Sequence, residues 1–442
     1  MSEDRGSVRE IAWREVFPWL LLVRAFRVSI QLSQIVLGSL GLLCTIFGWL
    51  VLSNLFAGSV ETPFAGWRIF YQSNPWNSPA ETMGMGPSNM MPLDVTCPYR
   101  EAWSDYPPKL GQFPSDPFLG PWRQLQAPFQ QLFDPRVRIT GLAFLFSCGL
   151  WAISVWGLFG GALTRRAAMQ LGREENIGLK AALGYATAKW RSFVAAPLLP
   201  MIGVLICAAP MFITGLLMRS DFGVAVAGLI WPLLLIGGLC IAMLLLVLLF
   251  GWPLMWPTIS AEGSDSFDAL SRPWSYVFHR PLHYLFYAAV ATALGYLGWL
   301  FVAHFALWVA YLPKWVVAWG AGHEQATRVF PELYRQAVGA ETPGPWGAGS
   351  IAFWGGCVRL LALGFVYSYF WTASTAIYLL LRRDEDGTEI DDVHLDGQQA
   401  HGLPVLEKDS TGVYIAPKNE AVATPGATAA ITPEDSSGKE VE

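Results

Sequence analysis

The sequence predicts an all-α membrane protein, a polytopic bundle of about six transmembrane helices. Of its 442 residues, 53% are hydrophobic and only 14% are charged, whereas about a quarter of the residues in an ordinary soluble domain are charged. The apolar residues form continuous runs long enough to cross a bilayer as helices, and they do not alternate as the strands of a membrane barrel would. The composition excludes a soluble enzyme and a disordered chain, and the net charge of −5 argues against nucleic acid as a partner.

Six segments, all rich in Gly, Ala, Leu, Val and aromatic residues, are predicted to span the membrane. They cover residues 28–56, 139–163, 194–218, 223–251, 283–312 and 351–381, and together form the first transmembrane helix and a five-helix core at 139–381. No Asp or Glu lies within any of these spans. Lys and Arg are concentrated in segment 164–193 and directly after the last span, so both termini are predicted to be cytoplasmic.

The regions outside the spans have distinct compositions. Residues 1–27 carry a helical apolar pattern, which predicts an interfacial helix kinked at Pro18, the alternative being a loop that borders the first span. Residues 57–138 are rich in Pro and Trp and predict an ordered, loop-rich cap outside the membrane, with a short helix near 121–133 lying on the membrane surface. Residues 398–442 lack apolar periodicity and predict a disordered tail.

A weak internal repeat organises the middle of the chain. Leu-Phe-Gly ends both the second and the fourth span, at residues 158–160 and 249–251. An insert follows each, at 164–193 and 257–282, and each insert is expected to form a pair of short amphipathic helices on the inner face. In the second insert Asp265 or Ser266 is placed to cap a helix whose apolar stripe contains Phe267, Leu270, Trp274 and Val277.

A second predicted outer loop covers 313–350. It contains a helical pattern at 324–338 that Pro331 interrupts.

Three segments of the chain resemble parts of other membrane proteins. GREENIGLKAALGYATAKWRSF, EGSDSFDALSRPWSYVFHRP and LLLRRDEDGTEIDDV resemble segments of bacterial six-span integral membrane proteins of unknown function. The unit of span, amphipathic pair and span is also loosely similar in pattern to the membrane domain of some glycerophosphodiester phosphodiesterases, without their catalytic domain. The resemblance covers about residues 140–290 and 360–396. It implies a shared architecture and a bacterial inner membrane as the location, and it carries no activity or catalytic residues.

Two ionisable side chains lie well inside predicted spans. His304 and Arg359 each lie eight or nine residues from the outer end of their spans, so they are expected at a similar depth. One interpretation is a shared polar site for an anion or a lipid headgroup. The alternative, which we favour, is that Arg359 reaches toward the membrane surface and His304 bonds to a neighbouring helix.

Charged residues near the inner ends of the spans are predicted to contact lipid headgroups or a protein partner. The cations in this set are Arg165, Arg166, Lys189, Arg191 and Arg280. Segment 382–397 is strongly acidic and fails the spacing of a calcium loop. We interpret it as a solvated cytoplasmic segment, with docking to a partner as the alternative.

No metal, cofactor or catalytic site is predicted. Met83, Met85, Met90, Met91 and Cys97 place soft sulfur ligands in the outer cap, but the run is broken by Gly and Pro and has no nearby His, so copper binding is a minor alternative. His279 and His283 straddle Pro281 without a third ligand. The six Cys suggest no disulfide framework, and five of them lie in apolar segments.

Three functional classes remain after these exclusions. The favoured hypothesis is a non-enzymatic scaffold or accessory protein that organises partners or lipids, with protein partners bound at the inner-face helices or the tail. The first alternative is a transporter or channel that uses the site near His304 and Arg359, although spans without carboxylates lack an obvious proton or cation carrier. The second is a lipid-acting membrane enzyme, for which no converging acid, base or metal ligands are evident.

Overall fold

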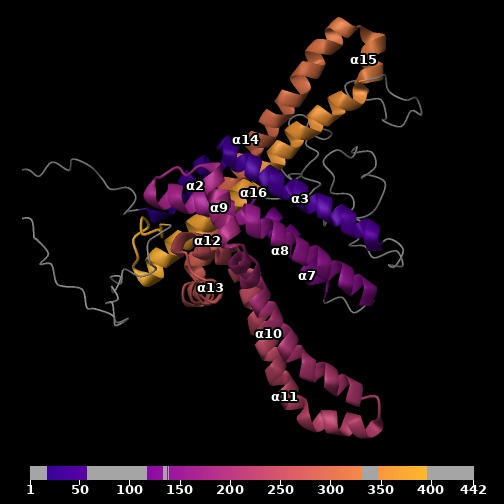
Figure 1. Ribbon diagram of the computed structural model, residues 1–442, viewed down its shortest axis with the longest axis vertical. Helices are drawn as coiled ribbons and strands as arrows, with labels where there is room; N and C mark the ends of the chain where they lie inside the picture. The colour runs from indigo at the N-terminus through magenta and orange to yellow at the C-terminus, as the bar shows by residue number, and fades with distance from the viewer. Residues whose placement is uncertain (1–16, 57–116, 133–136, 138, 331–346, 396–442) are drawn as a thin grey trace, which may run out of the picture. The chain divides into compact units, whose positions relative to one another are not determined.

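The computed structural model describes residues 17–56, 117–132, 137, 139–330 and 347–395, and within these ranges it is all-α (Figure 1). It confirms the predicted fold class, because six of the described helices are long and apolar enough to cross a membrane. The elements are η1 (Pro18–Leu20), α2 (Leu21–Ser29), α3 (Leu32–Phe56), α7 (Leu119–Gln131), α8 (Ile139–Ala168), the π-helical η4 (Met169–Arg173), α9 (Leu179–Ala188), α10 (Trp190–Leu217), α11 (Asp221–Leu246), the π-helical η5 (Val247–Gly251), α12 (Trp252–Glu262), α13 (Asp268–His279), α14 (Pro281–Ala321), α15 (His323–Val329) and α16 (Ala348–Asp386).

Several spans run further than hydropathy predicts. The second span continues through η4 to Arg173, and the fourth continues through η5 and α12 to Glu262. The predicted outer loop from 313 is wrong at its start, because α14 remains helical to Ala321. The first extension is stabilised by hydrogen bonds that its polar side chains make inside the protein, as Thr164 Oγ1 does with Ser260 Oγ at 2.7 Å. A hydropathy analysis counts these side chains only as polar and takes no account of their hydrogen-bond partners.

The described part of the N-terminal helix packs on the bundle, and Pro18 stands at its start. Pro18 begins η1, the first-turn position at which a missing N–H costs nothing. In α2, Leu21, Leu22 and Ala25 are buried. The apolar face of α2 therefore contacts the protein, chiefly α16 and α14, instead of lipid. Residues 1–16 of the predicted interfacial helix lie outside the described residues.

The short helix expected near 121–133 is present as α7, but it is inserted against the spans instead of lying only on a membrane surface. Trp122 Nε1 donates to Leu249 O at 3.0 Å, and Gln126 Nε2 donates to Leu248 O at 3.2 Å. Both acceptors belong to η5, where a π-turn alters the regular i to i−4 pairing. The side chains of α7 thus satisfy carbonyl groups in the irregular part of the fourth span.

The core is an aromatic cluster where α8, α12 and α16 meet. Trp371 stacks on Trp256 with ring centroids 4.4 Å apart, and Trp156 stacks on Tyr367 at 4.5 Å. Gly160 makes this contact sterically feasible, because a Cβ there would lie 2.8 Å from the Trp256 ring. The cluster fixes the three helices against one another.

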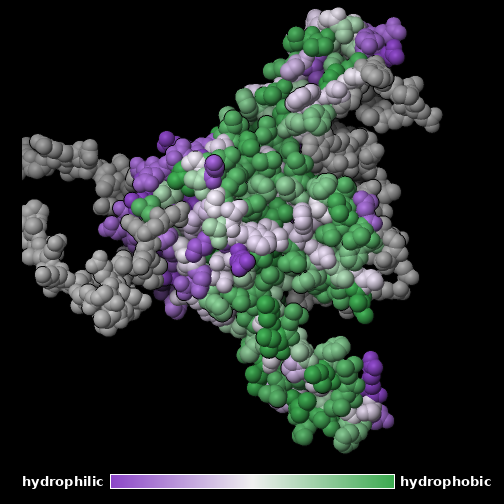
Figure 2. All heavy atoms as spheres, in the orientation of Figure 1, coloured by the Kyte–Doolittle hydropathy of each residue, from purple (hydrophilic) through white to green (hydrophobic). Residues whose placement is uncertain are grey.

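Polar residues gather at that end of the bundle. Figure 2 shows hydrophilic side chains over α2, α9, α13 and the C-terminal end of α16, and hydrophobic ones along the spans. The protein is an integral membrane protein whose apolar helices extend from a polar assembly of helix ends.

Candidate functional site

Three long helices end in the same way within this polar region. After η4, α12 and α16 the chain takes a left-handed conformation at Glu174, Gly263 and Gly387, with φ of 62°, 65° and 67°. Such a residue ends a helix by turning the chain back over its last carbonyl groups. Helices α9 and α13 begin at Leu179 and Asp268, five residues beyond the first two of these positions. The repeat suggested by the sequence therefore corresponds to a repeated structural unit.

The first returning helix, α9, covers the end of α12. Tyr185 Oη donates to Ile259 O at 2.6 Å, and Lys189 Nζ donates to Gly263 O at 2.7 Å. The Ile259 carbonyl lies in the last turn of α12 and also accepts from the Gly263 N–H, whereas the Gly263 carbonyl lies just beyond the helix. A cation at that end also interacts favourably with the helix dipole.

The second returning helix, α13, covers the end of α16. Arg280 Nε donates to Glu385 Oε2 at 2.8 Å, and Arg272 Nη1 lies 3.4 Å from Asp386 Oδ2. Tyr276 Oη donates to the same Asp386 carboxylate. The predicted cap is also present, since the N–H groups of Phe267 and Asp268 donate to Asp265 Oδ1 at 3.0 and 3.1 Å.

The third returning segment, residues 388–395, covers the ends of α8 and α12. The His394 N–H donates to Ala261 O, and Arg165 Nη1 donates to His394 O, both at 2.8 Å. Val393 is buried beside Gly172. The three contacts close a cycle in which each returning segment holds the end of another long helix. We call this assembly the helix-end ring: the C-terminal ends of α8, α12 and α16 with η4, α9, α13 and residues 388–395.

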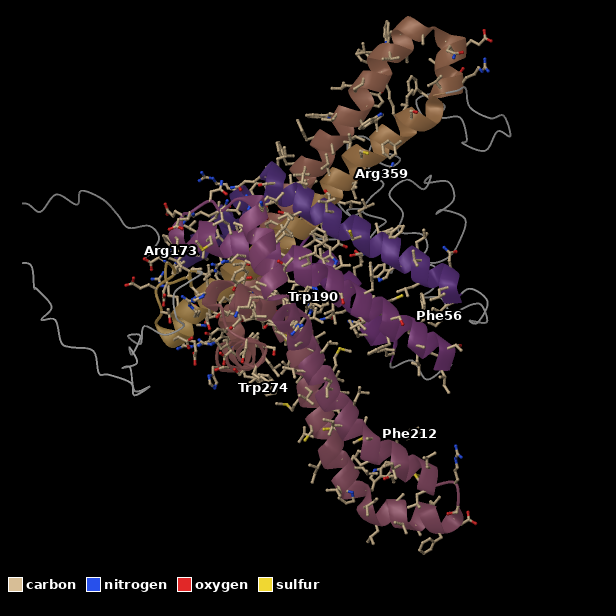
Figure 3. All side chains as sticks on the ribbon, in the orientation of Figure 1. Phe56, Arg173, Trp190, Phe212, Trp274 and Arg359 are labelled. Carbon is tan, nitrogen blue, oxygen red and sulfur yellow. The ribbon has the colours of Figure 1, made fainter. Side chains whose placement is uncertain are left out.

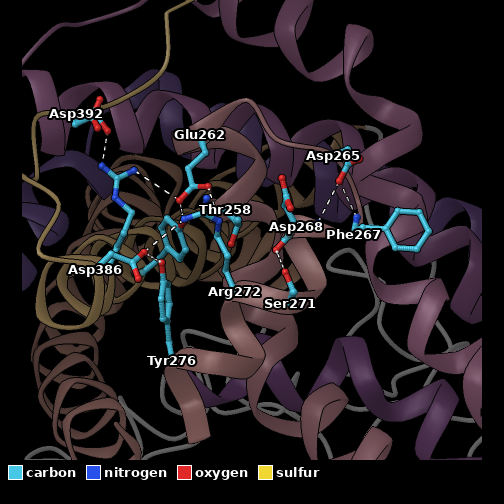
Figure 4. Close-up of polar contacts among 12 residues, drawn as sticks. Thr258, Glu262, Asp265, Phe267, Asp268, Ser271, Arg272, Tyr276, Asp386 and Asp392 are labelled. Carbon is cyan, nitrogen blue, oxygen red and sulfur yellow. Dashed lines mark hydrogen bonds and ion pairs between the residues drawn. The ribbon is translucent and has the colours of Figure 1, made fainter. Parts of the chain in front are cut away.

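The strongest concentration of charge in the helix-end ring surrounds Glu262 (Figure 4). Its carboxylate, 11% exposed, lies 2.9 Å from Arg272 Nε and 3.9 Å from Arg382 Nη1. Tyr378 Oη donates to it from α16. Arg272 also contacts Asp386, so one guanidinium joins the ends of α12 and α16.

Two groups of α13 have shifted pKa values that favour this arrangement. Burial lowers the pKa of the Arg272 guanidinium, but the Glu262 carboxylate and the Tyr276 and Tyr378 side chains together outweigh that effect, so its pKa lies above the ordinary value. Burial, together with the hydrogen bond to Asp386, holds the pKa of the Tyr276 hydroxyl well above its usual range. Arg272 therefore stays charged and Tyr276 stays neutral around pH 7.

This site is absent from the sequence predictions. No carboxylate was expected within a span, because the predicted fourth span ended before Glu262. Glu262 stands immediately before a glycine, which is a common signal for the end of a helix, and Arg382 stands near the end of another. Those signals, added to hydropathy, would have pointed to two helix ends that carry opposite charges.

Two of the predicted headgroup contacts are wrong. Arg165 and Arg166 lie inside α8, and each is only 3% exposed. Arg165 lies 4.3 Å from the centre of the Tyr185 ring, in addition to its bond to His394 O, and Arg166 Nη2 donates to Asn176 Oδ1 at 3.3 Å. Acceptors of the protein hold the Arg165 guanidinium, whereas Nε and Nη1 of the buried Arg166 have no hydrogen-bond partner among the described residues.

Of the other three cations predicted to contact headgroups or a partner, two contact acceptors of the protein and one is exposed. Lys189 and Arg280 contact Gly263 and Glu385, as described above. Arg191 is exposed at the start of α10.

The acidic segment is docked at its start instead of being solvated. Asp384 Oδ2 accepts from Tyr287 Oη at 2.8 Å, and Glu385 and Asp386 bind the cations of α13. Helix α16 continues through these residues to Asp386, because partners on α13 and α14 satisfy their charges.

The two intramembrane candidates are not joined by a hydrogen bond among the described residues. His304 Nδ1 lies 2.7 Å from Leu300 O of its own helix. Arg359 lies on α16 (Figure 3). His304 is thus engaged within α14, not with the neighbouring helix that we expected.

The remaining sequence predictions concern the outer Met cluster, the C-terminal tail and metal binding. The Met cluster, Cys97 and residues 396–442 are in undescribed parts of the chain. In the part of the chain that the structure describes, no group of three His, Cys, Asp or Glu side chains could hold a metal ion. The carboxylates of the helix-end ring are bound by Arg, Tyr and His, which suits them to hold helices together.

Comparisons with protein-family models, curated proteins and solved structures find no match to this chain.

Proposed function

We propose that the protein is a non-enzymatic membrane scaffold in which the helix-end ring anchors a helical hairpin that binds partner transmembrane helices. The hairpin consists of α10 and α11. One observation carries the proposal: of the residues of α11, which is described throughout, only Gly223 and Ala227 are buried. A span with so little of its surface covered by its own chain is available to lipid or to another helix.

The attachment of the hairpin supports this role. All but one of the buried residues of α10 lie near its start, at Phe193, Ala196, Pro197 and Pro200. There Trp256 Nε1 of α12 donates to Phe193 O at 2.8 Å. The hairpin is therefore held at its base by the helix-end ring and presents its length to the bilayer. Membrane helices associate through close packing and interhelical hydrogen bonds, so such a surface suits partners of the same kind.

Site-specific photocrosslinking along α11 in cells tests the proposal. A packed partner helix contacts one face, so adducts should follow helical spacing, for instance at Leu229, Leu233 and Ile236 and not at Leu235 and Leu239. The same probe at Phe305, an exposed position of α14, is the control for random encounters. Protein adducts of equal yield on every face of α11 would contradict the scaffold function. The absence of any protein adduct along α11 would contradict it as well.

Transport through a site near His304 and Arg359 remains the alternative, and a lipid-acting enzyme is a further one. No contact among the described residues favours either of them over a scaffold. The cytoplasmic placement of both termini, the bacterial inner membrane and the kinship with bacterial six-span proteins also remain proposals.

A further inference from the structure

Helix α13 has two faces of opposite character. Ala269, Pro273 and Tyr276 are buried against the rest of the protein. On the opposite side Phe267 is 68% exposed and Phe278 is 40% exposed. At about 100° per residue, Phe267, Trp274 and Phe278 fall within about 40° of one another on that side. Trp274 is partly buried, because it packs against the core as well as against Phe278, with the two ring centroids 4.5 Å apart.

The orientation of this aromatic face is fixed by the contacts on the other side. Arg272 bridges Glu262 and Asp386, and Tyr276 donates to Asp386. The Asp265 cap fixes the start of the helix. Turning Phe267 and Phe278 toward the protein would break these contacts, so their outward position is a property of the fold.

The aromatic face continues into the apolar surface of a span. Helix α14 starts at Pro281, directly after α13, and its first turns expose Leu282 (78%), Leu285 and Phe286. The exposed apolar side chains of this span therefore begin four residues after Phe278. Arg280 and His279, at the end of α13, place cationic and titratable groups at the junction.

Helix α9 shows that such a face is not a general property of the repeated unit. It occupies the same place after its left-handed turn, yet its exposed residues include Lys180, Gly184 and Thr187. Large aromatic residues on the exposed side distinguish α13 from α9. Aromatic residues on one face, polar groups on the other and a cation at the edge are the features of a helix in the membrane interface.

We infer that α13 binds the bilayer surface, inserting Phe267 and Phe278 at the boundary between headgroups and acyl chains, with the partly buried Trp274 packed beside Phe278. The occupant of this face is lipid. The inference is independent of the proposed scaffold function, which concerns α10 and α11. It places the helix-end ring at the membrane surface, with α13 lying in the plane of one leaflet.

Fluorescence quenching in proteoliposomes tests this inference. Single-cysteine variants Phe267→Cys and Phe278→Cys, with the six native Cys replaced, carry a small fluorophore. Asp268→Cys, on the exposed polar flank of the same helix, is the matched control, and Leu282→Cys reports lipid at the start of α14. The quenchers are brominated phosphatidylcholine in the bilayer and iodide in the buffer.

We expect brominated lipid to quench positions 267 and 278 about threefold more than position 268, and iodide to show the reverse order. Equal iodide quenching at 267, 278 and 268 would overturn the inference, because the face would then lie in water. Protection of 267 and 278 from both quenchers would overturn it too, since a protein partner or a second copy would cover the face.

Discussion

At the scale of single residues, Glu262 is the side chain on which most of the helix-end ring depends. It holds Arg272 and Arg382 from two different elements while it is largely buried. Its ion pairs thus connect α12 with both α13 and α16. A buried carboxylate that serves two cations is difficult to remove, because Arg382 then loses its counter-charge and Arg272 keeps only Asp386.

Substitution of Glu262 by Gln should therefore destabilise the protein strongly. The amide keeps the shape but removes the charge, and the expected loss in free energy of unfolding is about 3 kcal/mol. Denaturant unfolding in detergent, followed by tryptophan fluorescence, measures it. Glu385→Gln is the control, because its Arg280 partner is exposed, and it should cost far less than Glu262→Gln. Equal losses in the two variants would show that the Glu262 pairs have no special role.

The raised pKa of Tyr276 predicts that the stability of the folded protein depends on pH in the alkaline range. Burial and Asp386 raise the pKa of its hydroxyl in the folded protein above the value of about 10 expected in the unfolded chain. The folded state then keeps a proton that the unfolded state releases, so the free energy of unfolding falls as pH rises above about 10.

The variant Tyr276→Phe should lack this contribution. Comparison of denaturant midpoints for the two proteins between about pH 9 and 11 isolates it, because the other titrating groups are shared. If the denaturant midpoint of the wild type falls no more steeply with pH than that of the variant, the raised pKa of Tyr276 is refuted.

At the scale of elements, the contact between α3 and α16 depends on a pair of glycines. A Cβ on Gly38 would lie 2.3 Å from Gly364 O, and a Cβ on Gly364 would lie 2.0 Å from Ser39 Oγ. The two backbones are therefore close enough for Ser39 Oγ to donate to Leu360 O at 3.2 Å. This close approach is a frequent means of helix association in membranes.

Gly364→Ala should force the two helices apart. The expected cost is about 1–3 kcal/mol, typical of overpacking against backbone that cannot move away. Gly355→Ala in the same helix is the matched control, because nothing lies within 4 Å of the Cβ that alanine would add there, and alanine is the better helix former. Thermal unfolding in detergent should show a lower Tm for the first variant and an unchanged or higher Tm for the second. The opposite order would mean that α3 and α16 adjust freely.

Hydropathy was sufficient to predict the elements themselves. The six spans follow from apolar length, because a bilayer requires every backbone group to be satisfied within a helix. The insertion of α7 against η5 was not predictable in the same way. It depends on Trp122 and Gln126 meeting carbonyl groups more than a hundred residues away, at a π-turn that has no evident sequence signal.

For the described unit as a whole, the helix-end ring could not be predicted from the local sequence either. The Leu-Phe-Gly repeat and the paired inserts indicated repeated units, but not that each returning segment holds the end of another helix. Arg165 illustrates the difficulty: a cation after an apolar run resembles a headgroup contact, yet its acceptors are Ser260 O and His394 O, both distant in sequence. Local pattern specifies the charge of a helix end, and only the tertiary fold specifies its partner.

The cyclic arrangement predicts that residues 388–395 stabilise parts of the molecule that precede them by more than a hundred residues. Truncation after Gly387 removes the His394 contacts with Ala261 and Arg165 and the buried Val393. The expected loss is at least about 4 kcal/mol, from one buried aliphatic side chain and four hydrogen bonds, three of which arginine side chains donate to this segment. Truncation after Asp396 keeps these contacts and is the matched control. Denaturant unfolding of both proteins in detergent distinguishes the effects, and equal stability of the two truncated chains would show that this segment is not part of the ring.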